Sequence, residues 1–380
     1  MYYSSLASDS LVDILRLIRT PNVGPVTFFQ LIMRYGTAAE ALAALPNLSI
    51  RGGRKQAVKS PSKSEIDQEI DRVEKFGARF VRYGEADYPP LLNYISDAPP
   101  VLCIKGNASA YKDHPLVAMV GSRNASANAC QFAQKLAREV GASGINVVSG
   151  LARGIDSYAH KGSLSQGTIA VIAGGIDNIY PPENAVLYEE IQQNGVIISE
   201  QPFGQIPFAG AFPSRNRIIA GMSHATLVVE ASPKSGSLIT ARLALEYNRE
   251  LMAVPGSPLD PRAKGCNQLI KQGAHVAEEA ADIVQLVQSG KLQLSLNETA
   301  GSSFTSAAVN ESEVAAAHTV LMEKLGPSAV AIDELVEQCQ LSVAVAQAAL
   351  LELELAGKIR RVVGGKVALV YEDSDAQGAA

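Results

Sequence analysis

Hydrophobic residues follow different patterns in different parts of the 380-residue chain. Between residues 8 and 60 they recur at three- and four-residue spacing between Pro and Gly, which predicts short amphipathic helices. From about 79 to 276, uninterrupted apolar runs alternate with helical segments. Continuous hydrophobicity is typical of strands buried on both faces of a parallel sheet. The predicted strands are 116–121, 145–150, 168–175, 196–200, 226–231 and 251–256.

This alternation predicts an α/β fold with a doubly wound parallel sheet. We assign an extended Rossmann-like domain to residues 76–289 and a small helical domain, SAM-like or helix-hairpin-helix-like, to residues 1–75. Its segment "TPNVGPVTFFQLI" resembles a helix-hairpin-helix, in which a glycine turn offers backbone N–H groups to a phosphate. The glycine pattern is incomplete, which favours the alternative of a small packing bundle.

The last part of the chain predicts a winged helix. Residues 290–312 are polar and without periodicity, as expected of a linker. Three helical segments and two β-rich runs around Gly364–Gly365 then predict a winged-helix domain over 313–372, followed by a frayed tail at 373–380. The third helix, 342–357, carries two Glu and neither Lys nor Arg. It would repel phosphates, so we expect a protein-contact or regulatory module rather than a reader of duplex DNA.

Charge is distributed unevenly. The net charge is −5, but residues 1–275 carry 27 Lys and Arg against 23 Asp and Glu, a balance of +4. Residues 276–380 carry 6 against 15, a balance of −9. Any affinity for a polyanion must therefore come from a local site in the first three quarters of the chain.

The cysteines and the apolar segments indicate a cytoplasmic protein. Cys103, Cys130, Cys266 and Cys339 stand far apart without CxxC spacing, which argues against a disulfide framework or a zinc site. No apolar stretch reaches the roughly 18 residues that mark a membrane span. The start of the sequence lacks the basic and apolar regions of a secretion signal. We expect no contact with a membrane.

Four loops of the predicted sheet combine small residues with cations. Parallel sheets bind ligands at the carboxyl ends of their strands, and helix N-termini attract anions. Together the loops predict a strip of N–H groups and cationic side chains suited to several phosphates in a row. The candidate binding residues are Gly121, Ser122 and Arg123 in the first loop, Gly150, Arg153 and Gly154 in the second, Arg215 and Arg217 in the third, and Lys234, Ser235, Gly236 and Ser237 in the fourth.

The usual nucleotide fingerprints are missing. The first turn reads GSRNAS rather than GxGxxG, and no acid closes a second strand near 148 to hold a ribose. The P-loop pattern GxxxxGK[ST] is also absent. An ordinary dinucleotide or NTP site is therefore not predicted.

Candidate catalytic groups have a structural explanation as well as a chemical one. Asp156 and His160 share a helix face at i, i+4, without a third metal ligand at suitable spacing. We interpret His160 as a brace for the arginine loop and Asp156 as a capping or pairing group. Glu200 and Glu230 close two strands and suit either acid–base chemistry or the orientation of the arginines. We expect no catalytic residue, no metal and no cofactor.

At these loops the chain resembles the DNA-processing protein A (DprA, also called Smf) family, over about 116–276. The resemblance implies an extended Rossmann core that binds single-stranded DNA without known catalysis. It also implies a homodimer through this domain and delivery of the strand to a RecA-type recombinase during natural transformation. The rival interpretations are a Rossmann-type nucleotide sensor and a nucleoside-phosphate hydrolase. The matching blocks are "VAMVGSRNAS", "VVSGLARGIDSYAHKGSL", "AGGIDNIYPPEN", "ISEQPFG", "FPSRNRIIAGMS", "VVEASPKSGSLITARLALEYNRELMAVPG" and "GCNQLIKQGA".

The resemblance also points to individual residues. Arg123 and Lys234 match the family's own arginine and lysine, and the other candidate residues fall in the same blocks. Bases would stack on Tyr180, Phe203 or Phe212, because aromatic rings accept any base. Each phosphate contact on a single strand contributes about −0.7 to the log–log salt slope, so three or four contacts predict roughly −2 to −3.

Overall fold

The chain divides into two compact units. The computed structural model describes residues 6, 9–297, 310–362 and 364–370. Unit 1 comprises Asp67–Gly301, and unit 2 combines Tyr2–Ile66 with Ser302–Ala380. The division falls within helix α4 (Lys63–Lys75). The N-terminal helices and the winged helix therefore share one unit, which the hydrophobic pattern does not predict.

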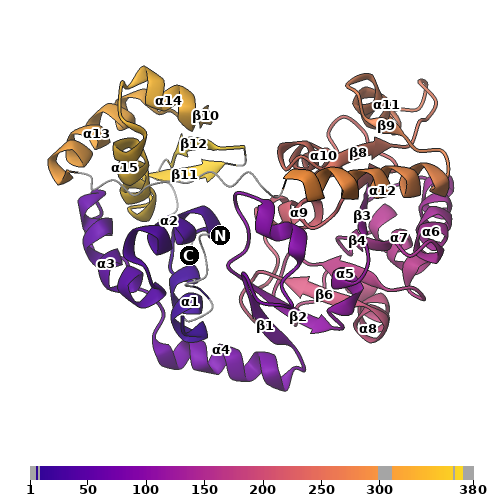
Figure 1. Ribbon diagram of the computed structural model, residues 1–380, viewed down its shortest axis with the longest axis horizontal. Helices are drawn as coiled ribbons and strands as arrows, with labels where there is room; N and C mark the ends of the chain where they lie inside the picture. The colour runs from indigo at the N-terminus through magenta and orange to yellow at the C-terminus, as the bar shows by residue number, and fades with distance from the viewer. Residues whose placement is uncertain (1–5, 7–8, 298–309, 363, 371–380) are drawn as a thin grey trace, which may run out of the picture. The chain divides into compact units, whose positions relative to one another are not determined.

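Unit 1 is built on a nine-stranded sheet in the order β1-β2-β6-β5-β4-β3-β7-β8-β9 (Figure 1). All neighbouring strands from β6 to β9 are parallel, and β1 and β2 add an antiparallel edge. The strands are β1 (Arg79–Arg82), β2 (Val101–Gly106), β3 (Leu116–Val120), β4 (Asn146–Ser149), β5 (Thr168–Val171), β6 (Val196–Ser199), β7 (Ala225–Val228), β8 (Glu250–Ala253) and β9 (His275–Val276).

The six predicted strands are confirmed as β3 to β8. Both faces of β3 are buried: Val117 and Met119 belong to a core with β4, β7 and α6, and Ala118 and Val120 are equally enclosed. Burial on both faces explains the continuous apolar runs. The helices and 3₁₀ turns of unit 1 beyond α4 are η1 (Pro90–Tyr94), α5 (Ser109–Lys112), α6 (Ala127–Ala142), α7 (Ile155–Ser163), η2 (Pro182–Asn184), α8 (Ala185–Asn194), α9 (Ala211–Gly221), α10 (Ser237–Glu246), α11 (Lys264–Lys271) and α12 (Ala280–Asn297).

Unit 2 joins the N-terminal helices to the winged helix. The predicted order of three helices and a hairpin is confirmed, and Gly364 and Gly365 both adopt positive φ at the hairpin turn. A short strand, β10, completes a three-stranded sheet in the order β10-β12-β11. The elements are α1 (Leu11–Ile18), α2 (Pro25–Tyr35), α3 (Ala38–Arg51), α13 (Glu311–Lys324), β10 (Val330–Ala331), α14 (Ile332–Gln338), α15 (Val343–Leu355), β11 (Ile359–Val362) and β12 (Lys366–Leu369).

The segment predicted as a linker, 290–312, is helical at both of its ends. Helix α12 continues to Asn297, and α13 begins at Glu311. Residues 298–309 and the predicted tail, 373–380, lie outside the described residues. Among the helices that the structure describes, none is long and apolar enough to cross a membrane.

Candidate nucleic-acid interface

Three of the predicted loops follow the carboxyl ends of three adjacent central strands, β4, β3 and β7. Strand β3 pairs with β4 on one side and with β7 on the other, so strand order reverses at β3. Ligands of doubly wound sheets bind in the crevice at such a switch point. The loops that follow these strands are 121–126, 150–154 and 229–236.

Backbone contacts bind the three loops together. The Ser122 amide donates to the Glu230 carbonyl over 2.7 Å, and the Ile155 amide donates to the Ser122 carbonyl over 3.3 Å. Gly154 has a φ of 72°, and a Cβ there would lie 2.3 Å from the Ser122 oxygen. A Cβ on Gly121 would lie 2.5 Å from the Ile155 side chain. These two glycines are therefore required by the packing of the loops on one another.

Arg123 and Arg153 are exposed and line one pocket of about 200 Å³. The Arg123 guanidinium lies 4.7 Å from the ring centroid of Phe212. Arg153 pairs with Glu183 at 2.5 Å, and both side chains are more than half exposed. An ion pair this exposed is weak, so a phosphate can replace the carboxylate at little cost. The structure brings two predicted cations to one concave surface.

The fourth predicted loop carries one more exposed cation, Lys234. It is not part of the pocket lining. Ser235 and Ser237 bond each other through their hydroxyl groups at 2.7 Å, and Ser237 is the first residue of α10. A Cβ on Gly236 would meet nothing within 4 Å, so the backbone there faces open space. This loop is accessible to a ligand, and its glycine is not explained by packing.

Arg215 lies inside the protein, with 6% of its surface exposed. Its Nη1 donates to the carbonyl of Gly150 at 2.5 Å and to that of Val171. The Asp156 carboxylate accepts from the Gly150 amide at 3.1 Å. Burial lowers the pKa of Arg215 to about 10 and raises the pKa of Asp156. We assign Arg215 to the support of the second loop rather than to phosphate contact, because its guanidinium is enclosed.

Arg217 is also buried, with 3% exposed. It pairs with Glu200 and donates to the carbonyl of Asp97. Burial alone would lower its pKa, but the carboxylates of Glu200 and Asp97 outweigh it, and the pKa of Arg217 is raised. The pair anchors α9 to the loop after β6. The structure thus separates Arg217 from the exposed cations with which the sequence groups it.

His160 is buried and supports the second loop, 150–154, by a hydrogen bond to its backbone. Its Nε2 accepts from the Leu151 amide at 3.3 Å, and its Nδ1 lies 2.8 Å from the Thr168 hydroxyl. Burial lowers the pKa of His160 to about 3, so the ring is neutral at pH 7. Leu151 has an unusual positive φ of 55°, and Asn184 bonds its carbonyl at 2.8 Å. Strained backbone held on several sides is a feature of binding sites.

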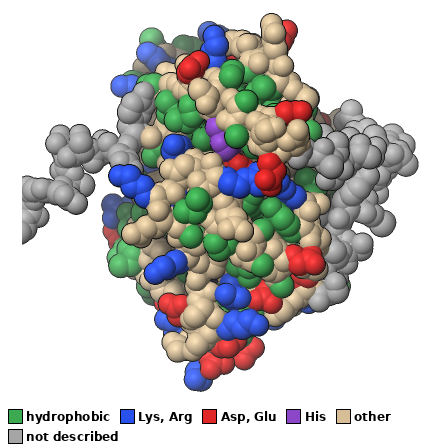
Figure 2. Space-filling model, turned by 90° about the vertical axis from the view of Figure 1, so that its left-hand side faces the viewer, with side chains coloured by type: hydrophobic (Ala, Val, Ile, Leu, Met, Phe, Trp, Pro, Cys, Tyr) green, Lys and Arg blue, Asp and Glu red, His purple; other side chains and the backbone are tan. Residues whose placement is uncertain are grey.

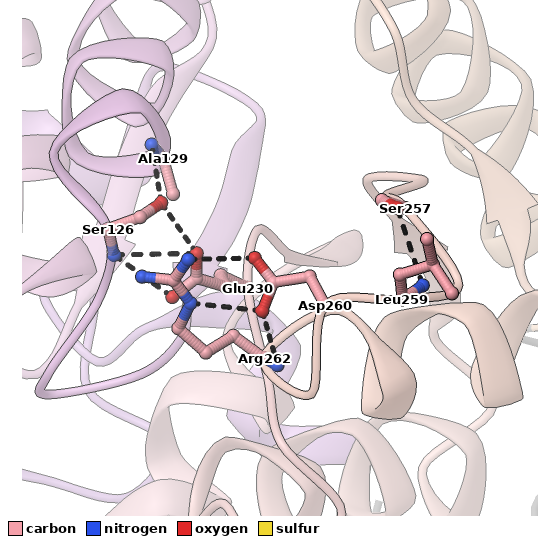
Figure 3. A network of polar contacts seen from close by, with 7 residues as sticks. All are labelled: Ser126, Ala129, Glu230, Ser257, Leu259, Asp260 and Arg262. Carbon is pink, nitrogen blue, oxygen red and sulfur yellow. Dashed lines mark hydrogen bonds and ion pairs between the residues drawn. The ribbon is translucent and has the colours of Figure 1, made fainter.

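Glu230 shapes the first loop. Its carboxylate accepts from the Ser126 amide at 3.1 Å and from the Ser126 hydroxyl at 2.7 Å. Ser126 is the N-cap of α6. Figure 3 shows the Arg262 guanidinium beside this carboxylate, held by Asp260 at 2.8 Å. The contacts of Glu230 therefore position the loop that bears Arg123.

The three aromatic candidates differ in accessibility. Tyr180 is 46% exposed and lines the pocket. Phe212 lines it too, but Arg123 and Tyr180 both contact its ring. Phe203 packs edge-on against Phe76 at 5.8 Å and is not part of the lining. Of the three, Tyr180 has the most accessible ring for a base.

Sequence reasoning missed several residues around the pocket. Asn124 and Asn178 line it, although both lie in loops that follow predicted strands and thus carried a usable signal. Pro207 also lines it, between the exposed Ile206 and Phe208 on the loop before α9. Exposed apolar side chains beside a pocket could have been suspected from the segment "GQIPFAG".

Three family models match the chain. "DNA recombination-mediator protein A" matches residues 79–288, more than half of the chain. "DprA-like N-terminal HHH domain" matches 8–71, and "DprA winged helix domain" matches 305–365. The N-terminal match corrects the interpretation that favoured a small packing bundle over a helix-hairpin-helix.

Known proteins are similar over much of the chain. Protein Smf of Synechocystis sp. is 43% identical over 214 residues, which cover 55% of this chain and 54% of that protein. The X-ray structure of DNA processing protein A from Streptococcus pneumoniae matches with a TM-score of 0.63 and 30% identity, covering 73% of this chain and 98% of that chain. A structure of DNA processing protein A from Helicobacter pylori, described for its single-stranded DNA binding mode, matches with a TM-score of 0.50 and 30% identity, covering 55% and 96%.

Proposed function

Since the chain belongs to the DprA/Smf family, we propose that it binds single-stranded DNA at the carboxyl edge of β3, β4 and β7. The observation that carries this proposal is the pocket that Arg123 and Arg153 share. Lys234 is exposed on the loop after β7, which contacts the Arg123 loop through its backbone. Guanidinium groups match the geometry of phosphate oxygens, and charge-assisted hydrogen bonds are the strong ones. The relative from Helicobacter pylori binds single-stranded DNA.

The size of the pocket favours a strand over a small nucleotide. Pockets that enclose a small molecule commonly measure about 300–1,000 Å³. The pocket beside Arg123 measures about 200 Å³. It suits one inserted base or phosphate of a longer ligand that lies across the edge of the sheet. A nucleotide sensor or a nucleoside-phosphate hydrolase, which would enclose a small ligand, fits this volume less well.

The nearby acidic groups support a binding role without catalysis. Asp156 accepts from backbone amides, Glu200 pairs with Arg217, and Glu230 holds the N-cap of α6. Each carboxylate is thus engaged in positioning a loop or a cation. We propose that the protein holds the strand without cleaving it.

The proposed partners follow from the family. We propose that the protein passes the bound strand to a RecA-type recombinase during natural transformation and homologous recombination. We further propose that it acts in the cytoplasm as a homodimer through unit 1. Filament formation by the recombinase on coated single strands, with and without this protein, tests the first proposal directly.

A length series of oligo-dT tests the binding site. Affinity should rise over several nucleotides, with a log–log salt slope of roughly −2 to −3. The double variant Arg123→Ala/Lys234→Ala should lose binding while its thermal unfolding stays unchanged. Lys271→Ala, an exposed lysine of α11, is the matched control and should bind normally. Saturation by a mononucleotide, or near-normal affinity of the double variant, would contradict the proposal.

A further inference from the structure

The winged helix of unit 2 contains a helix-turn-helix formed by α14 and α15. In DNA-binding proteins the second helix of this motif enters the major groove. Here α15 is buried almost all round, from Val345 to Leu355. A helix that is enclosed on every side belongs to an interior rather than to a free surface.

Two sets of contacts enclose α15. Ala349, Leu350 and Leu353 belong to the core of the winged helix itself. Glu352 and Leu355 are buried without belonging to that core, and Glu352 contacts Arg51 of α3. Figure 1 shows α15 beside α3, and the same neighbours are in contact in the structure.

Glu354 is a buried link between the two ends of the chain. Its Oε2 accepts from the Thr27 hydroxyl of α2 at 2.6 Å and from Arg361 Nε at 2.9 Å. Arg361 also donates to Gln30 Oε1 at 3.0 Å. A buried carboxylate without partners is costly, so this set of bonds stabilises the contact only while both sides stay together.

Glu352, two residues before Glu354 and so on a different face of α15, forms a second link. Its carboxylate is 1% exposed and lies 2.8 Å from Arg51 Nη2 and 3.2 Å from His318 Nε2. Arg51 ends α3, and it also pairs with Glu311 at 2.6 Å. The two Glu that seemed unsuited to DNA are thus matched to cations of this chain.

The backbones approach closely at Gly52, which follows α3. A Cβ at this position would lie 1.9 Å from the Glu352 carbonyl oxygen and 2.9 Å from the Ala356 Cβ. Such contact leaves no room for a side chain, so the fit between α3 and α15 depends on glycine.

The hairpin of the N-terminal domain lies at the end of α15. Asn22, in the turn between α1 and α2, has a φ of 66° and donates to the Leu355 carbonyl at 3.4 Å. A helix C-terminus carries partial negative charge. The turn that would offer amides to a phosphate therefore faces the end of a helix that repels phosphate.

We propose that α15 and the N-terminal helical domain are each other's binding partner, and that their contact covers the hairpin turn of that domain, whose amides would otherwise bind the phosphates of a DNA duplex. On this view unit 2 does not bind duplex DNA while the contact is closed. On the face drawn in Figure 2, which looks onto the side of α3 and α13, acidic and basic side chains of the described residues are interspersed rather than gathered into a basic patch. The inference does not depend on the strand site of unit 1.

Adding one methyl group between α3 and α15 tests the proposal in the full chain. Gly52→Ala should force α3 and α15 apart, so amide hydrogens of both helices should exchange faster. If the closed form dominates, the apparent affinity for a duplex of about 20 base pairs should rise by about tenfold or more, because masking multiplies the intrinsic affinity by the small fraction of open molecules. Gly326→Ala is the matched control, since its Cβ would meet nothing within 4 Å.

The exchange rates and the duplex affinity together support or overturn the proposal. Faster exchange together with stronger duplex binding supports the proposal. Unchanged exchange in α3 and α15 overturns the contact, and faster exchange without duplex binding overturns the masking. If Gly52→Ala unfolds unit 2, Glu354→Gln replaces it with the same two measurements, because it keeps the side-chain volume and removes the charge that Thr27 and Arg361 share.

Discussion

The edge loops of the sheet and helix α9 both carry arginines beside small residues, but they use them differently. Arg123 and Arg153 are exposed and face a pocket. Arg215 and Arg217 are buried, and their guanidinium groups bond carbonyls and a carboxylate of this chain. An arginine acts on a ligand only when its own chain has not already filled its donors.

The same contrast extends to unit 2. Its Arg51 and Arg361 are half-buried and bond Glu352 and Glu354, so these two cations are engaged within the unit rather than offered to a polyanion. The exposure and the bonding of each arginine, rather than the number of basic residues, distinguish an arginine that can bind phosphate from one that stabilises the fold. The predictions below test that separation.

The largest effect is expected from the buried pair. Arg217→Met should lower the free energy of unfolding by about 3–5 kcal/mol, because it removes the buried cation that pairs with Glu200, whose side chain is 13% exposed. Urea unfolding of this variant and of Arg123→Met provides the comparison, and the second variant should unfold like the unsubstituted protein. Should Arg217→Met keep its stability and instead lose affinity for single-stranded DNA, Arg217 would be a phosphate contact after all.

The sequence predicts most strands and helices of the fold, but it does not predict which arginine side chains are exposed. The run "LVAMV" of β3 is apolar at every position and predicts a buried strand, whereas "RFVR" of β1 lacks such a signal. The burial of Arg215 depends on a carbonyl 44 residues away, and that of Arg217 on one 120 residues away. Local pattern identifies residue types and loop positions, but long-range partners decide which cations remain free.

The same limit applies to the C-terminal module. The absence of Lys and Arg from α15 argues against phosphate contact, because its two Glu and a phosphate would repel each other. It did not indicate what the helix touches, since Thr27 is 327 residues from Glu354 along the sequence. Hydrophobic periodicity assigns a buried face to a helix, but not the segment that covers it.

A pH change should weaken the support of the second loop. The pKa of His160 in the folded chain is about 3, below its ordinary value of 6.5. The unfolded chain takes up a proton below pH 6.5 that the folded ring refuses until about pH 3, so stability falls as pH falls through this window. Between pH 7 and 5 the loss should reach about 2 kcal/mol. Urea unfolding of His160→Gln at the same pH values is the control, and an equal pH dependence in that variant would remove the histidine from the account.

An aromatic contact should sharpen the assignment of the pocket. Tyr180→Ala should weaken oligo-dT binding by about 1–3 kcal/mol if one base stacks on this ring. Tyr94→Ala, an exposed tyrosine of η1, serves as the matched variant and should bind normally. Fluorescence anisotropy at fixed salt measures both. Equal affinities for the two variants would place the bases elsewhere.

The smallest predicted effect has the opposite sign. At the proposed strand site, Glu183 would compete with phosphate for Arg153, and the two side chains are 57% and 60% exposed. Because exposed pairs contribute about 0.2–1 kcal/mol, Glu183→Gln should raise the affinity for oligo-dT by roughly 1.5- to 5-fold at low salt. The gain should shrink as salt screens the site. Glu139→Gln, which removes a partly exposed acid that pairs with Lys135 on α6, should leave the affinity unchanged. A gain of equal size in both variants would reflect net charge alone, whereas a gain confined to Glu183→Gln would identify Arg153 as a cation that the strand must take from its own chain.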